Sequence, residues 1–187
     1  MTIETTLIPS DPVMIDKVIS YIQIYLKDNL SWLNYSFGRA QKLTRMRDKK
    51  EHSYPGIYIK KNEYADLFPN EQFGNFSFFT TDDPQTIDWN PRIRNEIKTP
   101  CSLIIWYNLK KIYGCNTERN TEAIKAEVLR KLSDMTIASG RFSVEKIYEK
   151  AENIYKGYSL KEIDSQYLMQ PYGGLRIEGT LTFIEPC

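Results

Sequence analysis

The chain has 187 residues, 41% hydrophobic and 26% charged, which is an ordinary globular composition at a length sufficient for one well-buried core. Its net charge of +1 gives the whole chain no nucleic-acid or membrane signature, and no apolar run approaches the ~20 residues that span a bilayer. The three cysteines, none at CxxC spacing, argue against a disulfide framework or zinc site and for a reducing compartment.

The first expected element is an amphipathic helix. Ser10 or Asp11 caps it and Pro12 lies in its first turn, where the missing amide hydrogen is tolerated. Apolar residues then recur at helical spacing from Ile15 onward, which predicts a helix running to about Asp28 on one face of a sheet.

Two strands are expected to follow, at Trp32–Arg39 and Tyr54–Lys61, because apolar and polar side chains alternate there. Between them lies a strongly basic segment with five Lys or Arg in nine residues: Lys42, Arg45, Arg47, Lys49 and Lys50. If the two strands pair, this basic segment is the hairpin loop that joins them.

A different kind of segment covers residues 62–97. Its first thirty residues, Asn62 to Pro91, contain no Lys or Arg but carry several aspartates, glutamates and phenylalanines. We predict a short strand at Asn75–Thr80 and otherwise an ordered loop held by its aromatic residues, an acidic insertion within a single domain spanning 1–187.

The sheet is predicted to be centred on the strand Thr99–Tyr113. Its first half is apolar on both faces, which is typical of a strand covered on both sides, and its second half turns polar at alternate positions. Cys101, Leu103 and Ile105 are expected to share one face.

The remaining third predicts two helices and a final strand. One helix starts at Asn120 or Thr121; after a short strand near Phe142, a second helical stripe uses Ile147, Ala151, Ile154 and Tyr158. A short turn at 160–169 precedes a half-buried strand at 174–184, in which Gly179 marks a bulge or close packing. The fold class is therefore α+β, a two-layer sandwich of a mostly antiparallel sheet with helices packed on one face.

Few residues suggest chemistry. His52, the only histidine, is interpreted as a solvated residue of the basic loop, and Cys101 as a small core hydrophobe. Asp82, Asp83 and Asp88 have the residue type for a divalent cation or acid–base pair, but the Asp-Asp-Pro sequence also fits a turn, the reading we favour. No catalytic residue, metal site or cofactor is predicted.

The basic segment 42–50 has two readings: a solvated hairpin tip, or a contact with an anionic partner such as a nucleic-acid backbone or an acidic protein surface. The chain itself supplies an acidic candidate, because residues 62–91, after the second expected strand, carry several Asp and Glu and no Lys or Arg. Basic and acidic lobes on one chain let copies associate head to tail, and such contacts form a ring if the rotation closes.

The layout resembles the tail-terminator, or tail-completion, proteins of long-tailed bacteriophages and prophages. The resemblance rests on the first amphipathic helix, the segments YPGIYIKK and TPCSLIIWYNLKKIY, the following pair of helices, and the last strand GLRIEGTLTFIEPC. It implies a structural protein without enzymatic activity, whose hexameric ring ends the tail tube, joins it to the head-side connector or neck protein and lets DNA pass. It also implies assembly in the host cytoplasm and a final place in the virion, at the head–tail junction.

Two alternatives remain open from the sequence. One is another phage neck or tail-tube protein of similar subunit design. The other is a small enzyme or nucleic-acid-binding domain built around residues 42–50.

Overall fold

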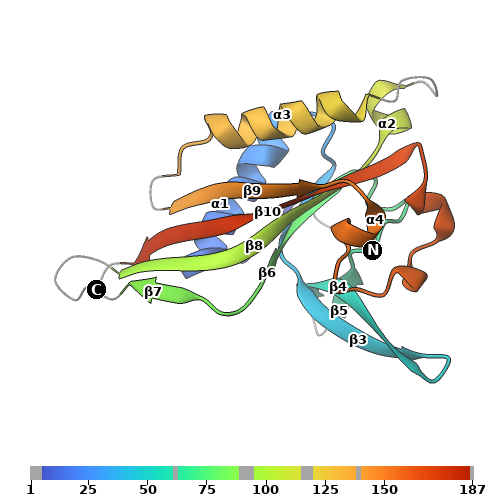
Figure 1. The fold of residues 1–187 in the computed structure, drawn as a ribbon, viewed down its shortest axis with the longest axis horizontal. Helices are drawn as coiled ribbons and strands as arrows, with labels where there is room; N and C mark the ends of the chain where they lie inside the picture. The colour runs from blue at the N-terminus through green and yellow to red at the C-terminus, as the bar shows by residue number, and fades with distance from the viewer. Residues whose placement is uncertain (1–5, 61–62, 89–94, 115–119, 138–139, 186–187) are drawn as a thin grey trace.

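The computed structural model describes residues 6–60, 63–88, 95–114, 120–137 and 140–185. Figure 1 shows the fold and its element labels. In chain order the elements are β1 (Thr6–Leu7), α1 (Met14–Asn29), β2 (Tyr35–Arg39), β3 (Gln41–Arg47), β4 (Lys50–Lys60), β5 (Glu63–Asp66), β6 (Phe76–Thr81), β7 (Thr86–Asp88), β8 (Asn95–Asn108), α2 (Leu109–Tyr113), α3 (Thr121–Asp134), β9 (Gly140–Tyr148), α4 (Ala151–Ile154), the 3₁₀ turns η1 (Leu160–Glu162) and η2 (Ser165–Leu168), and β10 (Tyr172–Glu185).

The strands form two sheets. The main sheet has the order β1-β2-β6-β8-β10-β9, with β7 also pairing with β8, and the smaller sheet has the order β3-β4-β5. In the main sheet β1, β2 and β6 are parallel, whereas every pairing that involves β8 or β10 is antiparallel. The predicted α+β class, with a mostly antiparallel sheet, is confirmed.

Strand β8 is the centre of the main sheet, as its sequence predicts. It pairs with β6 on one side and along its whole length with β10 on the other. Leu103 and Ile105 lie in the cluster under the long helices, and Ile104 and Trp106 lie in a second cluster on the opposite face. The strand is therefore covered on both sides.

The predicted extension of this strand to Tyr113 is wrong. The last five residues form α2, because the Asn108 side chain accepts a hydrogen bond from the Lys110 amide and caps a helical turn. Gly114, with φ of 70°, ends that turn in the left-handed region. The polar alternation at these positions therefore belongs to a helix end rather than to a strand that enters solvent.

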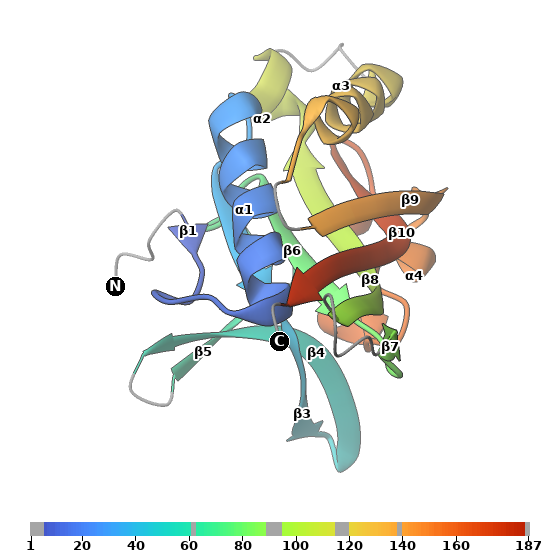
Figure 2. The ribbon, with the colours of Figure 1, turned by 90° about the vertical axis from the view of Figure 1, so that its left-hand side faces the viewer.

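Helices α1 and α3 cover one face of the main sheet (Figures 1 and 2). The predicted stripe of α1 is buried from Ile15 to Leu26. Its predicted start is wrong, since Val13 occupies the N-cap without a side-chain bond and Ser10, Asp11 and Pro12 precede the helix. For α3 the predicted start is confirmed, with Asn120 capping the Ala123 amide at 3.0 Å.

The opposite face of the main sheet carries a second hydrophobic cluster. It is covered by parts of β4 and β5, by the connection from β5 to β6, and by α4 with the turns that follow it. Aromatic side chains dominate this cluster, as the phenylalanines of the acidic segment suggest: Phe37, Phe68, Phe73, Phe76, Phe78, Trp106, Tyr155 and Tyr167. The two long helices on the first face are thus matched by a second covering layer of strands and short turns.

The acidic segment is integral to the sheet. It supplies β5, β6, β7 and the first residues of β8, and β6 lies between β2 and β8 in the main sheet. The strand predicted at Asn75–Thr80 is confirmed as β6. Trp89 to Arg94 lie outside the described residues.

The prediction that the basic segment is a loop between two paired strands is wrong. Residues 41–47 form β3, which pairs with β4 along seven positions and belongs to the smaller sheet. Only Asp48 and Lys49 form the turn, both with positive φ of 50° and 59°, as in a two-residue type I′ hairpin. Figure 2 shows this β3–β4 hairpin extending beyond the end of the main sheet.

The last elements of the chain agree only partly with the prediction. Strand β10 is confirmed, and the pairing with β9 shifts register between Glu178 and Gly179, which confirms a bulge there. Ile147, predicted on a helix, instead lies in β9 and pairs with Ile177 of β10. Helix α4 is only one turn long. The 3.6-residue spacing of the apolar positions spans a strand end and a helical turn, so it does not mark one helix.

Candidate functional site

One of the contacts that hold the basic hairpin to the body of the protein is a buried carboxylate, which acts beside the hydrogen bonds of Ser53 to Gly157 and Ser159. The side chain of Glu162, in η1, is only 2% exposed and accepts a hydrogen bond from Arg45 Nε at 2.8 Å. Its second oxygen lies 3.3 Å from His52 Nδ1 and 3.6 Å from Arg47 Nη1. Three side chains of the hairpin therefore converge on a residue more than a hundred positions later in the chain.

Arg45 is the centre of this ionic cluster. Its Nη1 also pairs with Asp66 of β5 at 2.8 Å, and its guanidinium lies 4.4 Å from the centre of the Tyr54 ring. Partial burial opposes the charge, but the fields and hydrogen bonds of Asp66 and Glu162 outweigh it and raise the pKa of Arg45. The positive charge of Arg45 is thus neutralised within the chain and serves the fold.

The predicted basic residues therefore separate into two groups. Arg45 and, at longer range, Arg47 pair with Glu162, whereas Lys42, Lys49 and Lys50 are exposed and form no ion pair among the described residues. His52 is not a solvated loop residue: it lies on β4, and its side chain is 14% exposed. Its predicted lack of a role in chemistry stays a prediction.

The predicted acidic residues lie elsewhere. Asp82, Asp83 and Asp88 are all exposed, on the connection from β6 and on β7. Asp88 adds a weak field at Lys98, whose pKa is raised mainly by its hydrogen bond to Glu96. Within the described residues no ion pair joins this acidic group to the basic hairpin, so one chain does not bring the two together.

Asp82 lies at a polar pocket of about 500 Å³, which we call the acidic pocket. Its carboxylates are Asp82, Glu145 and Glu178, and its cations are Lys156 and Arg176. Sequence reasoning missed this pocket, because Arg176 lies on the polar face of a strand predicted to be half-buried. That face is covered by α4 and the residues after it, and Arg176 is 5% exposed.

The polar groups of the acidic pocket are only partly satisfied. Arg176 Nε donates to Glu178 at 3.0 Å, its Nη1 donates to the Lys156 carbonyl at 3.5 Å, and Thr180 donates to Glu145 at 2.8 Å. Ser102, fully buried on the pocket wall, has a hydroxyl with no partner among the described residues. A buried hydroxyl without a partner costs free energy, so the pocket favours an occupant that can form a hydrogen bond.

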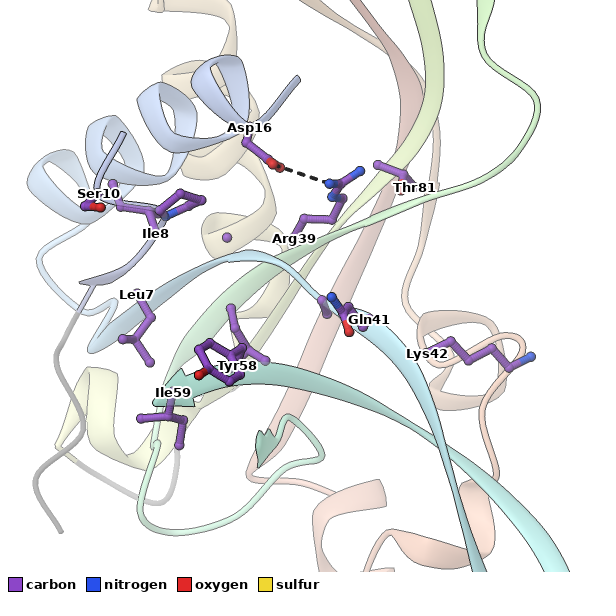
Figure 3. A pocket seen from close by; sticks show the side chains of 14 residues that line it. Leu7, Ile8, Ser10, Asp16, Arg39, Gln41, Lys42, Tyr58, Ile59 and Thr81 are labelled. Carbon is purple, nitrogen blue, oxygen red and sulfur yellow. Dashed lines mark hydrogen bonds and ion pairs between the residues drawn. The ribbon is translucent and has the colours of Figure 1, made fainter. Parts of the chain in front are cut away.

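A larger groove of about 750 Å³ lies where β1 and the start of α1 approach β3 and β4. Figure 3 shows its apolar residues Leu7 and Ile59 on one side and Arg39 directed at Asp16 on another. Arg39 Nη2 and Asp16 Oδ2 are 3.3 Å apart, which joins β2 to α1. Lys42 lies at the end of this groove, away from the hairpin tip (Figure 3).

Two absences concern the part of the chain that the structure describes. No group of three His, Cys, Asp or Glu side chains there is placed to hold a metal ion. None of the helices described is long and apolar enough to cross a bilayer. Cys115 and Cys187 lie outside the described residues.

Cys101 is buried in the cluster under α1, as predicted for a core residue, and burial raises the pKa of its thiol to about 12. We expect a variant that keeps only this cysteine, Cys115→Ser/Cys187→Ser, to resist a disulfide reagent at about pH 8, where exposed thiols react readily. Full reaction should follow denaturation in guanidinium chloride. Rapid labelling of the folded variant, read by absorbance, would contradict the buried position.

Comparison of the sequence with models of known protein families gave no match, and neither did a search of curated proteins. What the structure defines is a class of domain: an α+β domain with a sheet covered on both faces, a projecting basic hairpin and a separate acidic pocket.

Proposed function

We propose that this protein is a non-enzymatic structural subunit that assembles with copies of itself into a closed ring. The observation that supports this proposal is the position of the charged residues that form no ion pair among the described residues. The positive and the negative ones lie toward opposite ends of the molecule. The β3–β4 hairpin, with the exposed Lys49 and Lys50 at its tip, projects from one end of the molecule, whereas β7, which ends with the exposed Asp88, lies toward the other (Figure 1).

Opposite charges at opposite ends favour head-to-tail contacts. Such contacts use two different surfaces of each subunit, so they form a ring when the rotation between neighbours closes and a filament when it does not. The protein's single main sheet and its two-sided core provide a rigid body on which such surfaces keep a fixed angle.

The particular ring we propose is a phage tail terminator, as the resemblance of the sequence implies. Six copies would cap the tail tube, stop its growth and present the other face to the head-side connector, with DNA passing through the lumen. The mechanism is geometric, because the subunit acts by matching two partner surfaces. Other neck or tail-tube proteins, and a nucleic-acid-binding domain, are the competing functions.

Light scattering of the purified protein across a series of protein and salt concentrations tests the ring. We expect a discrete closed oligomer near six subunits that dissociates as salt rises, because exposed charge pairs are screened within about 10 Å at 0.1 M salt. The ring should also arrest growth of its cognate tail-tube protein, which an ordinary tube component would not do.

A monomer at every concentration would overturn the ring. If that monomer bound duplex DNA with an affinity that fell steeply with salt, the nucleic-acid-binding function would replace it. An unlimited increase of mass with concentration would instead indicate a filament, as expected for a tube component.

A further inference from the structure

Among the described residues, two features of the fold carry charged groups that form no ion pair: Lys49 and Lys50 at the tip of the β3–β4 hairpin, and Asp82 at the acidic pocket. The tip carries positive charge, and carboxylates outnumber cations in the lining of the pocket.

The hairpin tip has one cationic face. Cross-strand partners lie on the same face of a hairpin, so Arg47 and Lys50, which are paired, project together. Met46 and Glu51 are the next pair and project from the other face. Because the buried Glu162 anchors the hairpin at Arg45, the tip is presented as a fixed projection and loses little conformational freedom on binding.

The acidic pocket is suited to a cation. Glu178 is matched by Arg176, but Asp82 is exposed and makes no ion pair among the described residues, and Glu145 accepts only the Thr180 hydroxyl. The buried, unpartnered Ser102 hydroxyl is a third polar group at the same pocket. An ammonium group carries three donors and no acceptor, so it can satisfy carboxylates and a hydroxyl together.

An anionic occupant fits this pocket less well. Three carboxylates line it against two cations, and one of those cations is already paired. A phosphate or carboxylate would face Asp82 and Glu145 directly, and like charges at close range oppose binding.

We propose that the hairpin tip, through Lys49 and Lys50 with Arg47 beside them, docks into the acidic pocket of a second copy of this chain. The inference rests on the proposed ring and names its contact. Among the described residues no ion pair joins the tip to the pocket of the same chain, and Figure 1 shows the hairpin projecting away from the main sheet, so the contact we propose is between copies.

A charge-swap experiment tests this contact. The tip variant is Lys49→Glu/Lys50→Glu, and the pocket variant is Asp82→Lys/Glu145→Lys. Each variant alone presents like charges to its own neighbours, so we expect the concentration needed for assembly to rise about a hundredfold or more, because such contacts cost several kcal/mol. An equal mixture pairs each tip with an oppositely charged pocket and should re-form the oligomer with alternating copies.

Matched controls carry the same changes of charge elsewhere. Lys110→Glu/Lys111→Glu on α2 and Asp28→Lys/Asp134→Lys on α1 and α3 alter exposed positions away from the tip and the pocket. Both should assemble like the unaltered protein. Circular dichroism and thermal unfolding of every variant confirm that a loss of assembly is not a loss of fold.

The possible outcomes distinguish failure of the docking contact from failure of the proposed ring. Rings that persist in both single-site variants, or a folded mixture that fails to recover, would overturn the docking contact and leave the ring intact. A monomer for the unaltered protein at every concentration would overturn the docking contact and the proposed ring together.

Discussion

Replacing either of two adjacent isoleucines, Ile104→Ala or Ile105→Ala, should lower the free energy of unfolding by about 3 kcal/mol, within the range for large-to-small changes in cores. Both side chains are fully buried, yet they lie in different hydrophobic clusters because successive residues of β8 point to opposite faces. A sheet with one wet face would show a large effect at only one of them. Urea denaturation monitored by circular dichroism measures both.

The matched control is Ile87→Ala on β7, where the side chain is 57% exposed and the cost should stay below about 0.5 kcal/mol. A nearly neutral Ile104→Ala would contradict the second core. It would mean that the small sheet and α4 do not pack against the face opposite the long helices.

The second large effect is expected at Glu162. The substitution Glu162→Gln keeps the size of the side chain but removes the charge that faces Arg45, Arg47 and His52. Since hydrogen bonds to charged groups contribute about 1.5–3 kcal/mol, we expect a loss of stability of about 2 kcal/mol. Urea denaturation gives the total, and limited proteolysis within 41–52 reports on release of the hairpin.

Glu152→Gln, on the exposed surface of α4, is the matched control and should change little. If Glu162→Gln also had no effect on stability or on proteolysis, the hairpin would not be anchored by this carboxylate. A double-mutant cycle with Arg45→Met then separates the pairwise term from the cost of losing either partner alone.

The anchoring of the hairpin bears directly on the proposed assembly. Glu162→Gln leaves Lys49 and Lys50 unchanged but loosens the segment that carries them, which then depends on the Arg45–Asp66 pair and the hydrogen bonds of Ser53. We therefore expect it to weaken assembly through lost pre-organisation, whereas the tip variant weakens it through repulsion. High salt should lessen only the second effect, because screening does not restore rigidity.

Several elements could be predicted from the sequence because their burial leaves a periodic pattern. The stripe from Ile15 to Leu26 gave α1, and apolar residues on both faces of 101–107 identified β8 as a covered strand. The cap at Asn120 and the bulge at Gly179 were also predicted, since both depend on local backbone chemistry.

Strand β3 could not be found in this way. Most of its side chains are exposed on both faces, so its sequence has no alternation to detect, and its pairing with β4 makes it a strand. The prediction that Ile147 lies on a helix was wrong for the converse reason. Its helical spacing to Ala151 is a coincidence, and pairing with β10 makes it part of a strand.

The same division between what the sequence determines and what the tertiary structure determines holds for the charged residues. Composition alone located the basic segment 42–50 and the acidic residues at 82, 83 and 88. Only the tertiary structure decided which charges are used within the chain, by placing Glu162 against Arg45 and Arg176 against Glu178 under a covered face. The charge of a residue is a local property, but its neutralisation depends on neighbours in space, and for Arg45 and Glu162 those neighbours are 117 positions apart.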